Sequence, residues 1–176
     1  GDMTITPIRC TQNPTMGEEW RQGWHPESIA VLPRREKVLV VGAGPAGLEA
    51  ALSLARRGAE VTLAEKSRAL GGRILYESTL PGLGSWIRVR DWRTHMIGKL
   101  SNVQVYPDSK MTAGDIADFA ADHVVLATGS RWRRDAVGVM GMQPLELPKA
   151  LTPDDIFAGA AVVGPVVIYD DEHYFM

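Results

Sequence analysis

Three glycines at positions 42, 44 and 47 form the pattern with the clearest chemistry in this chain. Residues 42–47 read Gly-Ala-Gly-Pro-Ala-Gly, which matches G-x-G-x-x-G. The first glycine permits a tight turn, the second lets the backbone approach a pyrophosphate, and the third lets a helix pack closely on a strand. The helix that starts at Pro45-Ala46 presents N–H groups and a partial positive charge to the phosphates. The spacing predicts a phosphate-binding turn at Gly42, Gly44 and Gly47.

An acidic residue, Glu65, follows Gly47 by 18 residues, at the end of a second apolar segment. A carboxylate at this distance is placed to accept hydrogen bonds from the ribose hydroxyls of an adenosine. It would repel a 2′-phosphate, so the sequence favours ADP or an adenine dinucleotide without that group. Lys66 is a further candidate contact.

Two other segments are candidate parts of the same site. Gly72 follows Gly71 and would allow close approach of backbone to a ligand, and Arg73 could reach a phosphate. The alternative for this pair is a simple turn with a solvated arginine. Residues 124–127 are apolar and run into Thr128-Gly129, a segment that passes beside the ligand in flavin-type nucleotide folds but that could also be an ordinary strand end.

The elements that must position these residues alternate between strand and helix. Short valine-rich runs predict buried strands, and alanine–leucine periodicity predicts the helix after the glycine turn. Two strands that are buried on both faces and joined by a short helical crossover form a parallel pair, and such a connection is right-handed. The chain is therefore predicted to be an α/β protein with a Rossmann-like parallel sheet. The expected strands are 37–41, 59–64, 103–106, 122–127 and 162–169, with the core of the last at 166–169; the expected helices are 16–22, 45–57, 85–100, 113–119 and 152–158, with Ser85 and Thr112 as caps.

Composition narrows the function classes. The chain has 176 residues, is 45% hydrophobic and carries a net charge of −2, which suits one globular core and argues against nucleic acid as a partner. We find no apolar run long enough to span a membrane and no signal peptide, and the single cysteine, Cys10, suits a reducing compartment, so a cytoplasmic protein is expected. The four histidines lack metal-ligand spacing, and the five tryptophans are expected mainly in the core and at partner contacts.

Several segments together resemble the trimethylamine dehydrogenase family of iron–sulfur flavoproteins, which includes dimethylamine and histamine dehydrogenases and, more distantly, 2,4-dienoyl-CoA reductase. The resemblance runs through nearly the whole chain in order. It is carried by residues 10–27, the glycine motif, residues 70–72, the Leu-Pro-Gly-Leu-Gly run at 80–84, Arg90-Asp91, residues 124–132 and residues 174–176.

The resemblance implies an intact parent enzyme with an N-terminal FMN barrel, a [4Fe–4S] cluster and C-terminal nucleotide-binding domains. Cys10 would be the fourth cluster ligand in that parent only, since a cluster of this type needs four thiolates. The amine dehydrogenase branch carries ADP in the nucleotide domain, whereas the reductase branch carries FAD there and NADPH in a second domain. By the same resemblance, electron-transfer flavoprotein is a candidate partner, and the barrel and C-terminal domain are the other partners of this portion.

We therefore divide the chain into an extended lead-in at 1–36, an ADP- or FAD-binding domain at 37–160, and the start of a second nucleotide-binding-type domain at 161–176. No glycines follow the strand expected at 166–169, and three acidic residues stand there instead, which favours the amine dehydrogenase branch. The chain is read as the nucleotide-binding portion of an oxidoreductase, expected to have no amine dehydrogenase activity by itself. Two alternatives stay open: the FAD domain of a reductase, and a stand-alone nucleotide-binding module.

Overall fold

The structure is a computed structural model that describes residues 29–138 and 150–169, together with residues 16, 17, 20, 141, 144 and 146. The chain divides into two compact units, Gly1–Gly129 and Ser130–Met176. The expected helix at 16–22 and the proposed cluster ligand Cys10 fall largely or wholly outside the described residues.

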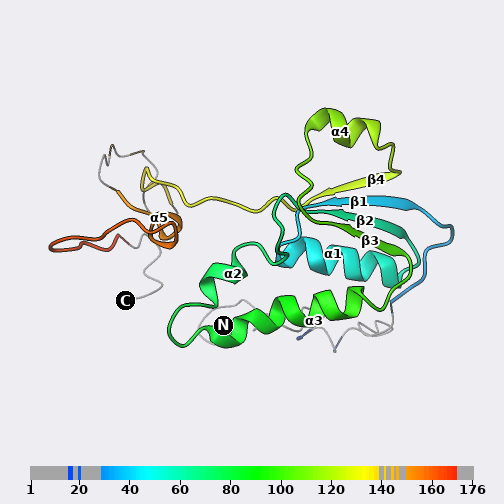
Figure 1. Cartoon of the computed structure of the whole chain (residues 1–176), viewed down its shortest axis with the longest axis horizontal. Helices are drawn as coiled ribbons and strands as arrows, with labels where there is room; N and C mark the ends of the chain where they lie inside the picture. Colours follow the sequence, from blue (N-terminus) through cyan, green and yellow to red (C-terminus); the bar gives the residue numbers. More distant parts are fainter. Residues whose placement is uncertain are drawn as a thin grey trace. The chain divides into compact units, whose positions relative to one another are not determined.

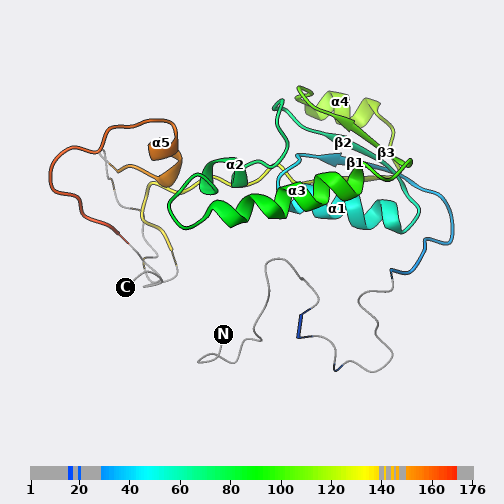
Figure 2. The same cartoon turned by 60° about the horizontal axis from the view of Figure 1, so that its bottom comes forward.

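The first unit is built on a four-stranded parallel sheet with the order β3-β2-β1-β4. The strands are β1 (Lys37–Val41), β2 (Glu60–Ala64), β3 (Val103–Tyr106) and β4 (His123–Leu126). Figure 1 and Figure 2 show the helices α1 (Pro45–Arg56) and α3 (Ile87–Ile97) on one face of the sheet and α4 (Ala113–Asp118) on the other. The α/β fold with a Rossmann-like parallel sheet is confirmed, and all four strands lie where the sequence predicts strands.

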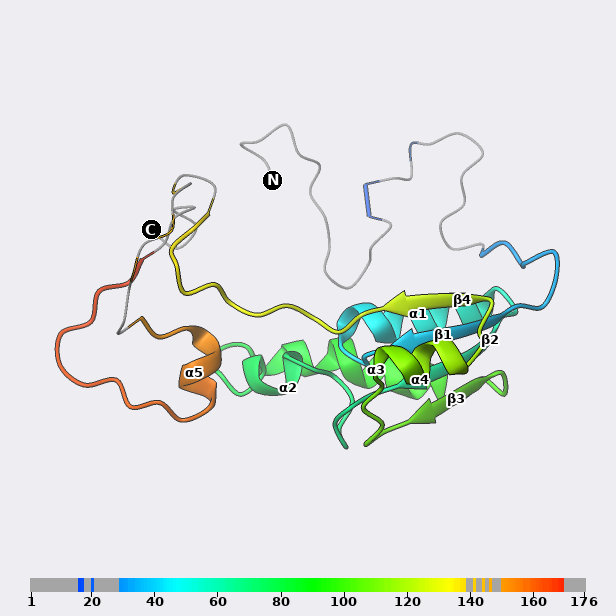
Figure 3. The same cartoon turned by 90° about the horizontal axis from the view of Figure 1, so that it is seen from above.

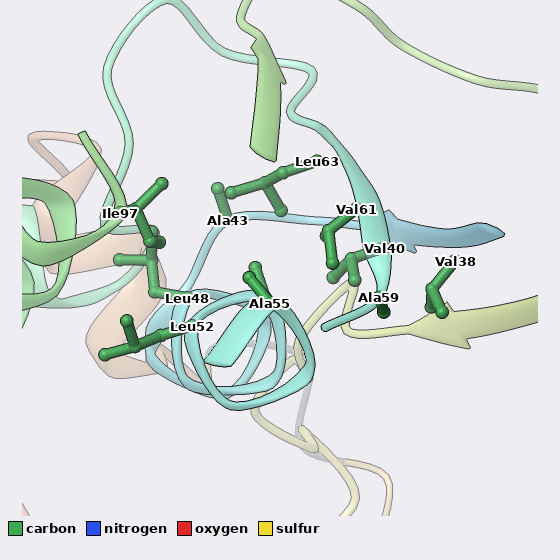
Figure 4. Packing of buried hydrophobic residues seen from close by; sticks show 11 residues of the cluster. Val38, Val40, Ala43, Leu48, Leu52, Ala55, Ala59, Val61, Leu63 and Ile97 are labelled. Carbon is green, nitrogen blue, oxygen red and sulfur yellow. The ribbon is translucent and has the colours of Figure 1, made fainter. Parts of the chain in front are cut away.

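The core lies between the sheet and α1. Alternate residues of β1 and β2 belong to one buried cluster with Leu48 and Leu52 of α1 and Ile97 of α3, and Figure 4 shows the members from the two strands: Val38, Val40, Val61 and Leu63. Each of these side chains is at least 96% buried, which contributes about 1.5–3 kcal/mol for a residue of this size. This packing fixes the start of α1 against the end of β1, where the glycine turn lies.

The strand β4 differs from expectation because it is not buried. Val124 and Leu126 are 42% and 68% exposed, whereas Val125 packs against the core. The register pairs Val124 with Leu39 and Leu126 with Val41, so the exposed residues share the α4 face of the sheet. β4 is an edge strand, because it lies at the end of the strand order with β1 as its neighbour. The apolar run in the sequence did not reveal this position in the sheet.

The long helix expected at 85–100 is shorter and is capped differently. A 3₁₀ turn, η1 (Gly84–Trp86), precedes α3, and Ser85 lies inside that turn without a capping hydrogen bond. The predicted apolar stripe is only partly buried: Val89 and Ile97 are inside, but Trp92 is 49% exposed and Arg93 is buried in its place. Arg93 can be buried because its Nε lies 2.7 Å from the Glu49 carboxylate of α1.

Tryptophans were expected mainly in the core and at partner contacts; Trp20, Trp86, Trp92 and Trp132 are all exposed in the described part of the chain, so none of these four is a core residue. The cap at Thr112 is confirmed: its hydroxyl accepts from the Asp115 N–H, and the Asp115 carboxylate accepts from the Thr112 N–H. The Thr112 N–H and hydroxyl both donate to the Asp115 carboxylate, and these two hydrogen bonds hold the pKa of Asp115 below its usual value. A very short helix, α2 (Ile74–Glu77), links the glycine pair at 71–72 to η1.

The second unit contains the expected helix near 152–158 as α5 (Pro153–Phe157), with a capping box between Thr152 and Asp155. The strand expected at 162–169 is absent from the described residues of this unit, where Val167 is 93% exposed and Ile168 is 82% exposed. A strand needs a hydrogen-bonded neighbour, and the described residues offer none to this run. The predicted boundaries at 36 and 160 stay predictions. Figure 3 gives a further view of both units.

Candidate nucleotide-binding site

The glycine turn lies at the carboxyl edge of the sheet, between β1 and α1. The Gly42 N–H donates to the Ala64 carbonyl at 2.7 Å, which ties the turn to the end of β2. Gly44 is the N-cap of α1 and Pro45 is its first helical residue, and the first turn of this helix carries no acidic side chain. The helix therefore presents its unpaired N–H groups and partial positive charge at the turn.

The three glycines of the motif serve different purposes. A Cβ atom at Gly47 would lie 1.8 Å from the Gly42 carbonyl oxygen, and one at Gly42 would lie 2.4 Å from the Ala127 carbonyl oxygen. Both glycines are therefore required by the fold itself. At Gly44 nothing lies within 4 Å of the Cβ position, and its φ of −71° suits any residue. The protein leaves space at Gly44 that its own packing does not need.

The carboxylate of Glu65 lies beside this turn, at the end of β2. Glu65 is only 6% exposed. Its Oε2 accepts from the Ala43 N–H at 2.7 Å, and its Oε1 accepts from the Ser67 N–H at 2.9 Å. Each carboxylate oxygen has a second lone pair, so both can still accept a hydroxyl donor. The backbone thus holds a buried acceptor in a fixed orientation at the edge of the turn.

The pair Gly71-Gly72 packs against the other side of the turn. The Gly71 N–H donates to the Ala43 carbonyl at 2.8 Å, and a Cβ atom at Gly72 would lie 3.1 Å from the Gly44 Cα. Gly72 has a φ of +56°, which disfavours other residues. Arg73 follows at the start of α2 and forms an ion pair with Glu77 at 3.8 Å. The segment therefore borders the open space at Gly44.

The end of β4 supplies the last of the predicted site residues. The Ala127 N–H donates to the Val41 carbonyl, and the Thr128 Cα lies 3.2 Å from a Cβ position at Gly42. Thr128 and Gly129 are exposed. The structure thus brings Gly42, Gly44, Gly47, Glu65, Gly72 and Thr128 to one edge of the sheet, while Pro45, Ala46 and Lys66 are exposed beside them.

Sequence reasoning assigned no role to Arg90, whose stem packs on Gly71: a Cβ atom there would lie 3.0 Å from the Arg90 Cγ. It also missed the ion pair between the half-buried Glu49 and the buried Arg93, which joins α1 to α3. The one signal in the sequence was Arg90-Asp91 within the segments that carry the family resemblance.

The described ranges contain no group of three or more His, Cys, Asp or Glu side chains that could hold a metal ion. Among the helices that the structure describes, none has the length and apolar character required to cross a membrane. The residues at the turn instead fit an adenine nucleotide: the space at Gly44 suits a diphosphate, and the Glu65 carboxylate suits a ribose.

Comparison with known proteins places the chain among flavin- and nucleotide-dependent oxidoreductases. The chain is 40% identical to dimethylamine dehydrogenase of Hyphomicrobium sp. (strain x), over 99% of this chain and 25% of that protein. It superposes on histamine dehydrogenase from Rhizobium sp. 4-9 with a TM-score of 0.86 and 50% identity, over 99% of this chain and 26% of that chain. It is 41% identical to NADH oxidase of Thermoanaerobacter brockii, over 70% of this chain and 18% of that protein.

The chain spans about a quarter of the length of the two amine dehydrogenases. The relationship predicted from the sequence, to the trimethylamine, dimethylamine and histamine dehydrogenase family, is confirmed, and the chain corresponds to the nucleotide-binding portion of such flavoproteins. Residues 36–164, which include the whole glycine turn, Glu65 and the end of β4, match the family described as pyridine nucleotide-disulphide oxidoreductase, and the chain belongs to that family.

Proposed function

We propose that this chain binds an adenine nucleotide as part of an iron–sulfur flavoprotein oxidoreductase of the amine dehydrogenase type. ADP is the first candidate for this nucleotide. The observation that carries the proposal is the Glu65 carboxylate, which is buried, held by two backbone N–H groups and placed beside the unfilled space at Gly44. A diphosphate at Gly44 would receive the N–H groups of the first turn of α1. The ribose would then donate its hydroxyls to Glu65.

The remaining predicted residues act around this pair of contacts. Gly42 and Gly47 shape the turn, Gly72 lets the second backbone segment approach, and Pro45, Ala46, Lys66, Arg73, Thr128 and Gly129 border the nucleotide. When FAD is the ligand, its flavin supplies hydride or electron transfer, whereas ADP supplies no redox chemistry. In either case the chain's own residues bind and orient the adenosine diphosphate portion.

The wider assignment rests on the relatives. The intact enzyme would hold FMN in a barrel and a [4Fe–4S] cluster with Cys10 as its fourth ligand, would act in the cytoplasm, and would pass electrons to a partner such as electron-transfer flavoprotein. This chain by itself would then bind nucleotide without oxidising an amine.

Discrimination against a 2′-phosphate tests the site. We expect isothermal titration calorimetry of the whole chain to show binding of ADP and at least tenfold weaker binding of its 2′-phosphorylated form, because Glu65 repels the added charge. Equal affinities for the two nucleotides, or no binding of ADP, would contradict the proposal.

Replacement of Glu65 by alanine is expected to weaken ADP binding by about 1–3 kcal/mol, the range for a hydrogen bond to a charged group. The same change leaves the buried Ala43 N–H without its acceptor, so the free energy of unfolding should also fall. Calorimetry and denaturant titration measure the two effects separately. Glu60→Ala, at the opposite end of β2, is the matched control and should leave affinity unchanged. If Glu65→Ala binds ADP as tightly as the unchanged chain, the ribose role is wrong.

A working FAD site is the second candidate, and it is favoured by the 41% identity to an NADH oxidase. Purified chain that retains a yellow flavin absorbance after gel filtration would support this candidate. Colourless protein with ADP released on denaturation would exclude it.

A further inference from the structure

Arg90 lies next to the glycine segments of the proposed site. The Gly71 N–H donates to the Ala43 carbonyl of the turn at 2.8 Å. On its other side Gly71 supports the Arg90 stem, since a Cβ atom there would lie 3.0 Å from the Arg90 Cγ. One residue thus separates the Arg90 side chain from the glycine turn.

The guanidinium of Arg90 is incompletely paired within the described part of the chain. Its Nη1 forms an ion pair with the neighbouring Asp91 at 3.1 Å, but its Nε is buried and has no hydrogen-bond partner there. A buried N–H of a charged group without an acceptor is costly, and such groups in native proteins usually have a ligand or water as partner.

Arg93 lies one turn further along α3 and is an arginine with a structural role, which makes it a useful comparison with Arg90. Its Nε lies 2.7 Å from the Glu49 carboxylate, its Nη1 donates to the Val89 carbonyl at 2.9 Å, and it is 5% exposed. Arg93 is therefore fully engaged in joining α1 to α3. Arg90 pairs only through its Nη1 with the neighbouring Asp91, its Nε has no partner among the described residues, and about a third of its side chain is open to solvent.

The negative charges of a bound diphosphate and of Glu65 would need a positively charged side chain nearby. A diphosphate at Gly44 would lie near the buried Glu65 carboxylate, and the α1 terminus contributes only about half a positive charge. Arg73 is engaged with Glu77. Arginine suits a diphosphate because its planar fork gives two parallel hydrogen bonds to phosphate oxygens.

We infer that Arg90 is a further nucleotide-binding residue, whose side chain turns on Gly71 to place its guanidinium against the diphosphate. This inference rests on the proposed function. It adds a residue of α3 to a site otherwise made from the glycine turn, the end of β2 and the end of β4. It also predicts that the site distinguishes nucleoside diphosphates from nucleosides through Arg90.

The test compares Arg90→Met with Arg88→Met and Arg93→Met in the whole chain, using calorimetry with ADP and with adenosine and thermal unfolding without ligand. Arg88 is exposed on the same helix and is the neutral control. Arg90→Met is expected to lose about tenfold or more in ADP affinity, the usual effect of losing a charge-assisted contact, with adenosine affinity unchanged. Its melting temperature without ligand should equal or exceed that of the unchanged chain, because the change removes an unpaired buried N–H. Arg93→Met should instead melt at a lower temperature.

Arg90→Lys separates charge from geometry. A lysine keeps the charge but loses the fork, so its ADP affinity should fall between those of the unchanged chain and Arg90→Met. The inference is overturned if Arg90→Met binds ADP as the unchanged chain does, or if it loses ADP and adenosine affinity equally together with melting temperature. If the unchanged chain binds no ADP, the proposed function and the role of Arg90 fail together, which distinguishes that result from failure of Arg90 alone.

Discussion

Replacing Gly47 with alanine is expected to destabilise the chain by about 3 kcal/mol or more, at the upper end of the cost of overpacking. The added Cβ would lie 1.8 Å from the Gly42 carbonyl oxygen and 2.9 Å from its carbon. Both are backbone atoms of Gly42, whose N–H is hydrogen-bonded to the Ala64 carbonyl and which lies against the Ala127 backbone, so no flexible side chain can move aside. Either α1 must shift away from the core or the turn must break. Denaturant unfolding followed by circular dichroism measures the loss.

Gly98→Ala is a suitable control for this experiment. Gly98 is the C-cap of α3 with helical backbone angles, and a Cβ there would meet its nearest atom at 3.4 Å. This variant should unfold close to the unchanged chain. A Gly47→Ala protein with an unaltered unfolding midpoint would show that the close contact between turn and helix is wrong.

The second large effect is expected for Gly44→Ala, which should lower the affinity for ADP and leave the stability of the fold nearly unchanged. Gly44 has a φ of −71° and open space at its Cβ position, so Gly44→Ala should change the free energy of unfolding by no more than about 1 kcal/mol. The methyl group would occupy the space assigned to the diphosphate. ADP affinity should therefore fall by about 2 kcal/mol, or some thirtyfold, as the hydrogen bonds to the charged phosphates are lost.

Calorimetry with ADP and denaturant titration on the same preparation measure both quantities for Gly44→Ala. Gly47→Ala and Gly44→Ala thus form a pair in which one glycine is required for the fold and the other for the ligand. A Gly44→Ala chain that binds ADP as tightly as the unchanged chain would mean that the diphosphate does not occupy this space.

The sequence was sufficient to predict the glycine turn and the order of the elements around it. The valines of β1 and the alanine–leucine period of α1 follow the rules of a buried strand and an amphipathic helix, and both lie within one residue of the predicted bounds. Local hydrogen bonding also predicted the Thr112 cap. These features depend on residues close together in the chain.

Features that depend on partners distant in the chain were not predictable. The apolar residues of β4 and of 162–169 look like buried strands in sequence, but burial depends on what neighbours them, and Leu126 and Val167 are exposed. The buried Arg93 broke the expected stripe of α3 because its partner, Glu49, lies 44 residues away. Arg90 was missed for the same reason: only the folded chain brings α3 against Gly71.

The different roles of Gly42, Gly44 and Gly47 could be assigned in this chain only from the structure. The pattern G-x-G-x-x-G gives all three the same letter, and general rules assign them turn, ligand and packing roles. The close contacts at Gly42 and Gly47 show that the fold requires these two glycines, whereas the open space at Gly44 supports the ligand role proposed for it. The site residues as a set stay a prediction until a nucleotide is seen bound.

A crystal structure of the whole chain grown with ADP is the most direct test of the central claim, that the turn at Gly42–Gly47 and Glu65 together hold an adenine nucleotide. We predict the diphosphate within hydrogen-bonding distance of the backbone N–H groups at the start of α1, and the ribose hydroxyls on the Glu65 carboxylate. A nucleotide bound elsewhere, or one bound at the turn with its ribose away from Glu65, would contradict the account.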